Sequence, residues 1–138
     1  MIQTGSIEKQ SAFFRLLSDD QIEELLENAR EEIFNLRFQH ASARLEDVMR
    51  VRHVRRDVAQ LKTVLRMRQL AIEEAAQAPE VVEAIDGQEW SAEAYFDYEE
   101  SRWLVSFVDE NDDELAEARV DLNKKKIRGR EARRKARA

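Results

Sequence analysis

Cysteine is absent from this chain of 138 residues, and it has only one proline and three glycines. A chain without cysteine can form neither a disulfide framework nor a thiolate zinc site. Helix breakers are missing between Ile7 and Pro79, which favours long helices there. No run of about 18 apolar residues occurs, so no transmembrane helix is predicted. The N-terminus also lacks the pattern of a secretory signal, and we therefore expect a soluble, cytoplasmic protein without a membrane partner.

Charged residues, in contrast, make up 38% of the chain, and they are unevenly distributed. The net charge of -6 on its own disfavours a nucleic-acid partner. Residues 1–72, however, hold 12 basic and 11 acidic residues, whereas residues 73–123 hold two basic and 17 acidic ones. Residues 124–138 hold nine basic residues and one acid. This asymmetry predicts an electrostatic partner rather than an enzyme cleft.

Two long amphipathic helices are predicted within residues 1–72. Ser18, two acids and Gln21 form the pattern of a helix N-cap with a capping box. Apolar residues then recur at helical spacing at positions 22, 25, 26, 29, 33 and 36, and again at 54, 58, 61, 65 and 72. A break at residues 40–45 predicts a turn. Because long helices joined by a short turn pack antiparallel, we expect a helical hairpin with a short N-terminal helix.

After Pro79 aromatic residues become frequent and the hydrophobic pattern becomes that of strands. Residues 102–108 alternate, with Trp103, Val105 and Phe107 on one face, and the segment 115–122 alternates too. A three-stranded antiparallel meander over about residues 94–122 is therefore predicted. A sheet of this size needs a helix or a partner on its apolar face.

The predicted fold class is thus mainly α, with a small antiparallel β meander and a basic tail added to the hairpin. We expect three segments: the helical hairpin at residues 1–72, the acidic segment at 73–123 and the basic tail at 124–138. Within the acidic segment, residues 73–89 are predicted to end the long helix and then to form a linker.

Few residues suit catalysis or metal binding. The two histidines, His40 and His53, have no second ligand at metal spacing. The acidic run at residues 109–114 lacks the glycine and the 12-residue pattern of a calcium loop, and no phosphate-binding or nucleophile motif occurs. We therefore predict no enzyme activity, no metal and no cofactor.

Basic residues gather in the second predicted helix. At about 100° per residue, one face of that helix carries Arg52, Arg55, Arg56, Lys62 and Arg66, away from the apolar stripe. Arg44, Arg50 and Arg68 belong to the same basic stretch. Such a face suits the phosphates of structured RNA, but charge spacing alone supports a merely solvated face equally well. The tail is open to the same two interpretations.

Three blocks of sequence are more specific: EIFNLRFQ at residues 32–39, ASARL at 41–45 and VRHVRRDVAQLKTVLRMRQL at 51–70. They resemble, in order and spacing, the bacterial large-subunit ribosomal protein number twenty-nine family, over about residues 16–72. The resemblance implies a hairpin-like protein that binds large-subunit ribosomal RNA (rRNA) near the polypeptide exit tunnel. It also implies a monomer within the ribosome, beside ribosomal protein number twenty-three, where nascent-chain targeting and chaperone factors dock.

The positions that the resemblance implies as RNA-facing are Arg37, Gln39, Ser42, Arg52, Arg55, Arg56, Lys62 and Thr63. Arginine forks suit phosphates, and the neutral side chains suit phosphate or sugar hydrogen bonds. Charge adds the tail residues Lys124, Lys125, Lys126, Arg128 and Arg130. The turn departs from the family, whose glycine is replaced by Ala43. We expect this replacement to alter the turn backbone, while Arg44 adds a possible RNA contact.

The family ends soon after the position of Leu70, so residues 73–138 are an extension, named so below. One interpretation is a ribosomal extension whose tail binds rRNA while its acidic part faces solvent or basic proteins. The other is a docking module for a factor at the exit site. In either case we expect residues 73–121 to lie mostly away from RNA. The alternative function for the whole chain is a non-ribosomal helical adaptor.

Overall fold

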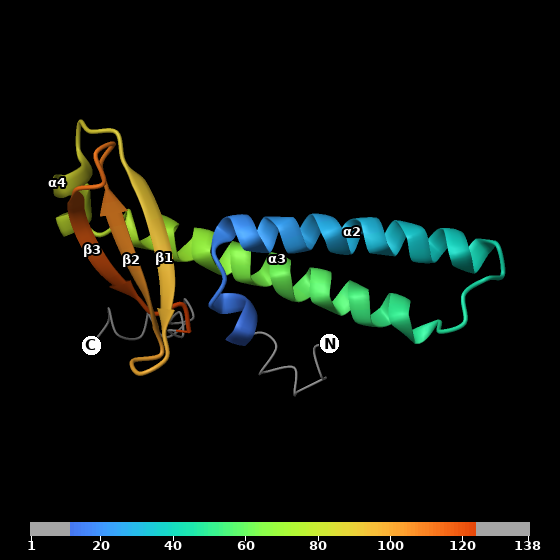
Figure 1. Cartoon of the computed structure of the whole chain (residues 1–138). Helices are drawn as coiled ribbons and strands as arrows, with labels where there is room; N and C mark the ends of the chain where they lie inside the picture. The colour runs from blue at the N-terminus through green and yellow to red at the C-terminus, as the bar shows by residue number, and fades with distance from the viewer. Residues whose placement is uncertain (1–11, 124–138) are drawn as a thin grey trace, which may run out of the picture.

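The structure, a computed structural model, describes residues 12–123, and these form helices at one end and a small sheet at the other (Figure 1). The predicted RNA-contacting tail residues Lys124, Lys125, Lys126, Arg128 and Arg130 lie outside the described residues. Within the described part, no helix is both long enough and apolar enough to cross a membrane.

Helix α2 (Asp19–Ala41) begins at the predicted cap. The Ser18 hydroxyl accepts a hydrogen bond from the Gln21 backbone N–H at 3.3 Å, and the Gln21 side-chain oxygen accepts one from the Ser18 N–H at 3.1 Å. Two of the N–H groups that a helix start leaves without a partner are thereby satisfied. Asp19 and Asp20 follow at the positive end of the helix dipole. The predicted capping box is confirmed.

The turn after α2 is closed by backbone hydrogen bonds around Ala43. The Ala43 N–H donates to the His40 carbonyl at 3.1 Å, and the Arg44 N–H donates to the Gln39 carbonyl at 2.9 Å. This is the Schellman arrangement, which needs a left-handed residue after the helix. Ala43 supplies it with a φ of 54°. An alanine therefore occupies a left-handed position here, where glycine carries no Cβ penalty.

The Ala43→Gly variant should consequently be more stable than the parent chain. An alanine at positive φ costs about 1–2 kcal/mol, of which the greater freedom of glycine in the unfolded chain cancels a part, so a net gain of about 0.5–1 kcal/mol is expected. Urea unfolding followed by circular dichroism measures it. Ala41→Gly, at the last residue of α2, is the matched control and should lose stability. A gain in stability there as well would contradict the explanation.

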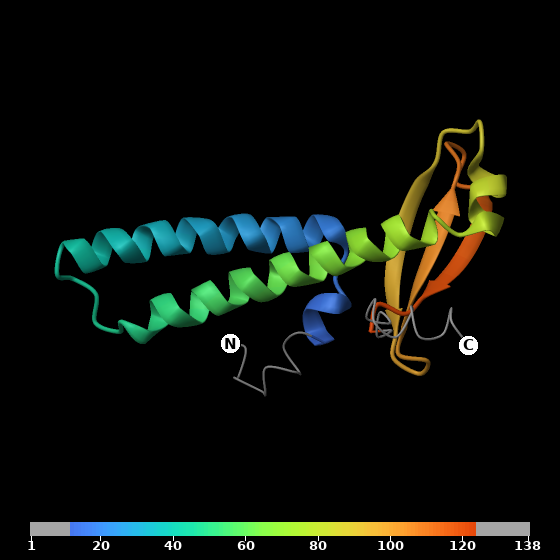
Figure 2. The ribbon, with the colours of Figure 1, turned by 180° about the vertical axis from the view of Figure 1, so that it is seen from behind.

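Helix α3 (Met49–Ala75) lies beside α2 and runs in the opposite direction (Figures 1 and 2). We call α2 and α3 the helix pair. Its core contains Ile22, Leu26, Leu61 and Val64, and Phe14 from the helical turn at residues 12–15 completes it. The long helices and the short helical segment before α2 follow the prediction from hydrophobic spacing.

The extension contains the predicted three-stranded antiparallel sheet, in the order β1-β2-β3. Its strands are β1 (Ser91–Asp97), β2 (Arg102–Val108) and β3 (Glu114–Val120). Trp103, Val105 and Phe107 of β2 are all buried, so the predicted apolar face of this strand is confirmed. The sheet begins slightly earlier than residue 94, where it was expected to begin.

The apolar face of the sheet is covered by the C-terminal end of α3 and by a further helix, α4 (Pro79–Ile85). Ala71 and Ala75 of α3 and Val81 of α4 are buried in the same cluster as β2. The prediction of a linker was therefore wrong over residues 79–85, because Pro79 starts a helix there. The boundary expected after residue 72 lies inside α3.

The sheet also contacts the N-terminal helical turn. The Tyr98 hydroxyl donates to the Ala12 carbonyl at 3.2 Å, and the Arg15 guanidinium lies 4.7 Å from the centroid of the Phe96 ring. A cation over an aromatic face is attracted by the ring quadrupole. Segments that are more than 80 residues apart in the sequence are thus held together at the sheet end of the helix pair.

Candidate nucleic-acid interface

One face of α3 carries a row of exposed cations, which we call the basic stripe: Arg52, Arg55, Arg56, Lys62 and Arg66. Helical periodicity keeps them on one side because the opposite side is fixed by buried Val54, Leu61 and Val64. Between residues 49 and 72 the only acid in α3 is Asp57, which is half-buried and faces a groove between the helices. Over this length, therefore, the stripe itself carries no negative charge.

Hydrogen bonds separate two classes of arginine. Arg30, Arg50, Arg66 and Arg119 form ion pairs with Glu27, Glu32, Glu73 and Glu100, with N–O distances of 3.3, 2.6, 3.4 and 2.8 Å, respectively. In contrast, the described residues provide no side-chain hydrogen bond or ion pair for Arg37, Arg44, Arg52, Arg55 and Arg56. All five are exposed, and all five were predicted from the sequence to face RNA. An unpaired guanidinium keeps its fork of donors available for a phosphate.

The neutral side chains predicted to face RNA are also exposed, but one of them already makes a hydrogen bond within the protein. Gln39 and Ser42 lie at the end of α2, and Thr63 lies on α3 beside Lys62. The Thr63 hydroxyl donates to the Ala59 carbonyl at 2.8 Å. With its proton used, this oxygen can accept from a ribose 2′-OH but cannot donate to a phosphate.

Arg37 and Arg55 come from different helices and share one hollow. It has a volume of about 200 Å³ and is lined by Arg37, His40, Val48, Val51 and Arg55. The C-terminal turns of α2 supply the first two residues, while the other three come from the start of α3 and the residue before it. The structure thus brings two of the predicted RNA-facing arginines together.

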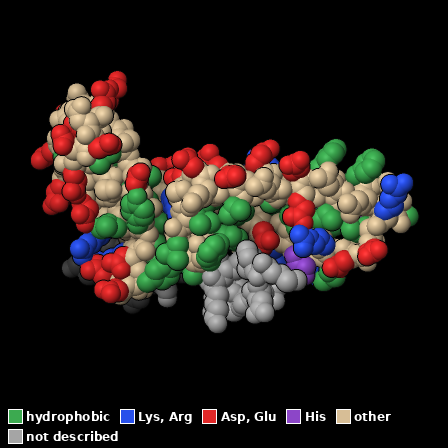
Figure 3. Space-filling model, viewed as in Figure 1, with side chains coloured by type: hydrophobic (Ala, Val, Ile, Leu, Met, Phe, Trp, Pro, Cys, Tyr) green, Lys and Arg blue, Asp and Glu red, His purple; other side chains and the backbone are tan. Residues whose placement is uncertain are grey.

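An aromatic pair on α2 was not among the predicted site residues. Phe34 and Phe38 lie one helical turn apart, and 70% and 67% of their surfaces are exposed. Figure 3 shows hydrophobic side chains protruding at the end of the helix pair away from the sheet. Exposed aromatic rings beside arginines are typical of surfaces that stack on unpaired bases. Their position on either side of Arg37 in the sequence was the signal that could have identified them.

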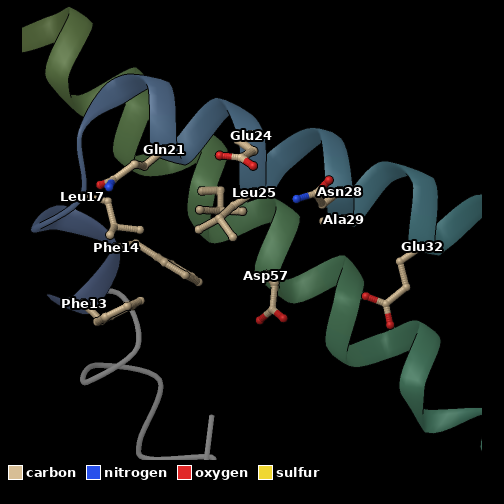
Figure 4. Close-up of a pocket in the computed structure, with 11 residues that line it drawn as sticks. Phe13, Phe14, Leu17, Gln21, Glu24, Leu25, Asn28, Ala29, Glu32 and Asp57 are labelled. Carbon is tan, nitrogen blue, oxygen red and sulfur yellow. The ribbon is translucent and has the colours of Figure 1, made fainter. Parts of the chain in front are cut away.

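A second hollow, between the N-terminal turn, α2 and α3, has different chemistry (Figure 4). This groove of about 550 Å³ has apolar walls that include Phe13, Phe14 and Leu25. Its charged lining consists of the carboxylates of Glu24, Glu32 and Asp57. Because carboxylates repel phosphates, this groove is a poor site for nucleic acid.

Arg68 belongs to the basic stretch of the sequence but not to the basic stripe. Only 5% of its surface is exposed. Its guanidinium donates to the backbone carbonyls of Arg15 at 3.0 Å and of Leu17, and it pairs with the Asp19 carboxylate. Arg68 therefore holds the N-terminal turn against the helix pair and is not available to a phosphate.

The extension carries acidic side chains, which gather at the sheet end of the molecule (Figure 3). On the outer face of the sheet the Tyr95 hydroxyl donates to the Glu93 carboxylate, and this hydrogen bond raises the pKa of Tyr95 above its usual value. No cluster of three or more metal-binding side chains occurs in residues 12–123. The acidic sheet within residues 73–121 is therefore unsuited to phosphate.

Comparison with known proteins identifies the helical half of the chain. The family model of the ribosomal L29 protein matches residues 14–68. The large ribosomal subunit protein uL29 of Geobacillus stearothermophilus is 47% identical over 57 residues, which are 41% of this chain and 86% of that protein. The chain belongs to the ribosomal L29 protein family. The uL29 protein of Brevibacillus brevis is 48% identical over 59 residues, which are 43% of this chain and 91% of that protein.

The family match covers α2 and the N-terminal three quarters of α3, and so includes the basic stripe and the hollow with Arg37 and Arg55. It ends before the C-terminal turns of α3, α4 and the sheet. The resemblance expected from the three sequence blocks is confirmed, and the extension lies outside the matched segment.

Proposed function

We propose that this chain is a structural constituent of the large ribosomal subunit that binds large-subunit rRNA through the basic stripe and the end of α2. The observation that carries the proposal is the set of five exposed arginines without a partner among the described residues, all within the family segment. Bidentate arginines fix a protein on RNA by its phosphates, while shape rather than sequence selects the site. The helix pair then acts as the family's helical hairpin.

The location that we propose is the surface of the ribosome near the polypeptide exit tunnel. The relatives are named large ribosomal subunit proteins, and 86–91% of the length of the two described above aligns with this chain. We propose that it is present there as a monomer beside protein number twenty-three, where targeting and chaperone factors dock. No catalytic step is part of this role.

For residues 73–121 of the extension we propose a position away from the rRNA phosphates. Residues 73–121 carry all 17 acids of the acidic segment, and only Arg102 and Arg119 oppose them. Arg119 is already paired with Glu100. We propose that the acidic sheet faces solvent or basic neighbouring proteins while the tail contacts rRNA. A docking module for a factor is the second candidate, favoured by the position of the sheet at one end of the helix pair.

Sedimentation tests the central proposal. The chain should sediment with large subunits through moderate salt and should be released when the rRNA is dissociated. Salt screens a single exposed charge contact strongly, whereas several phosphate contacts buried together in an interface keep the chain bound at moderate salt. A chain that stays entirely in the soluble fraction would instead support the non-ribosomal adaptor. RNA crosslinks that fall mainly on the sheet, with none on the tail, would overturn the proposal for the extension.

A further inference from the structure

We infer that the hollow between the end of α2 and the start of α3 binds one unpaired nucleotide of the RNA. Arg37 and Arg55 hold its phosphate, and its base lies against Val48 and Val51. This inference rests on the proposed RNA-binding function and adds to it a specific pocket and the class of nucleotide that the pocket takes.

The hollow is preformed, because the segment around it is fixed by hydrogen bonds on each side. The Schellman bonds at Ala43 and Arg44 close the end of α2. At the start of α3 the Asp47 carboxylate accepts from the Met49 N–H at 2.9 Å. Arg50 then ties α3 to Glu32 of α2 through bonds of 2.6 and 2.8 Å. A site that is already ordered loses less entropy when it binds its ligand.

The rim of the hollow suits an anion. Arg37 and Arg55 are exposed, and no described residue provides either side chain with a hydrogen bond or an ion pair. No acidic side chain is among the five residues that line the hollow. Guanidinium groups from two helices that converge on one hollow can together hold a phosphate.

The wall of the hollow suits a base. Val48 is 57% exposed, and Val51 is half-buried beside it. A phosphate alone would leave this apolar wall in water, and an apolar side chain of another protein would leave both guanidinium groups without a counter-charge. A nucleotide with an unstacked base provides a phosphate for the two guanidinium groups and an apolar face for the two valines. In paired RNA the bases remain stacked, so only an unpaired nucleotide can enter.

Photocrosslinking tests this inference on the full chain bound to purified large-subunit rRNA. A photoreactive phenylalanine analogue at position 48 should form an adduct with one nucleotide that is unpaired in the rRNA. The same analogue at position 82, an exposed valine on α4, is the matched control and should form no RNA adduct. An adduct with paired or widely scattered nucleotides, an adduct with a protein in assembled subunits, or no adduct at position 48 would overturn the inference.

Affinity gives a second, independent measurement. Val48→Asp places a carboxylate beside the expected phosphate at an exposed position just before α3, where it disturbs no buried contact, so the fold should persist. Binding to the rRNA should weaken about tenfold, and binding to a fully paired RNA duplex should not change. Val82→Asp should change neither. If Val48→Asp binds rRNA as tightly as the parent chain while the basic stripe remains essential, the inference about the hollow is wrong and the proposed function stands. If the parent chain binds no rRNA, the proposed function itself is wrong.

Discussion

Replacing Arg52, Arg55 and Arg56 together with glutamine should weaken binding to large-subunit rRNA by roughly a thousandfold. At about 1.5 kcal/mol for a hydrogen bond to a charged group, three lost contacts amount to about 4.5 kcal/mol. The slope of log affinity against log salt should fall by about two to three units, since each lost phosphate contact removes about 0.7–0.9 of a released counterion. Filter binding across a salt series measures both quantities.

The matched control replaces Arg30, Arg102 and Arg119 with glutamine, which changes the net charge by the same amount. These arginines are exposed but lie outside the basic stripe, on α2 and on the sheet. Their loss should change affinity and salt slope only slightly. Helix content should be unchanged in both triple variants, because all six side chains point to solvent. An equal loss of affinity in the control would mean that net charge, and not the stripe, binds the RNA.

Local patterns predicted most of the secondary structure because local interactions determine it. The cap at Ser18 depends on residues within one turn, and both of its predicted hydrogen bonds are present. The alternation in β2 placed Trp103 and Phe107 on one face, where they are buried. The short helix α4 was missed because its local sequence signal is weak. Seven residues are too few for a periodic signal, and a proline was interpreted as a breaker although it is favoured at the first position of a helix.

The contacts between the two halves of the chain could not be predicted, since they join residues far apart in sequence. Ala71 and Ala75 continue the apolar spacing of α3, but nothing local indicates that they face a sheet instead of α2. As a result, α3 contributes to the core of the helix pair and to the core under the sheet. The charge pattern of the sequence changes at residue 72, but α3 continues through it and packs on both sides. The exposure of the residues that we predict to face RNA was easier to anticipate, because the resemblance and the periodicity indicated the same face.

Arg68 could have been distinguished from the basic stripe by its spacing. It lies four residues after Val64 and seven after Leu61, on the buried side of α3. Periodicity could not supply its partners, however, because the carbonyls of Arg15 and Leu17 are about 50 residues away in the sequence. An arginine at an apolar position of a helix therefore predicts burial, and only the fold identifies what it binds.

The Arg68→Met variant should lower the free energy of unfolding by about 2–4 kcal/mol, since two carbonyls lose their donor in a partly buried site. Asp19 adds little to this loss because its side chain is 60% exposed. Part of the cost is offset, since the Arg68 Nε atom is buried without a partner among the described residues and methionine removes it. Urea unfolding followed by circular dichroism measures the change.

Arg66→Met makes the same chemical change two residues earlier on the same helix, where the side chain is exposed and weakly paired with Glu73. It should alter the free energy of unfolding by no more than about 0.5 kcal/mol. The difference between the two variants isolates burial and the carbonyl contacts from the loss of a positive charge. If both lost the same stability, Arg68 would not hold the N-terminal turn. Burial of Phe14 in the core of the helix pair, and the contacts of the turn with Phe96 and Tyr98, would then fix it instead.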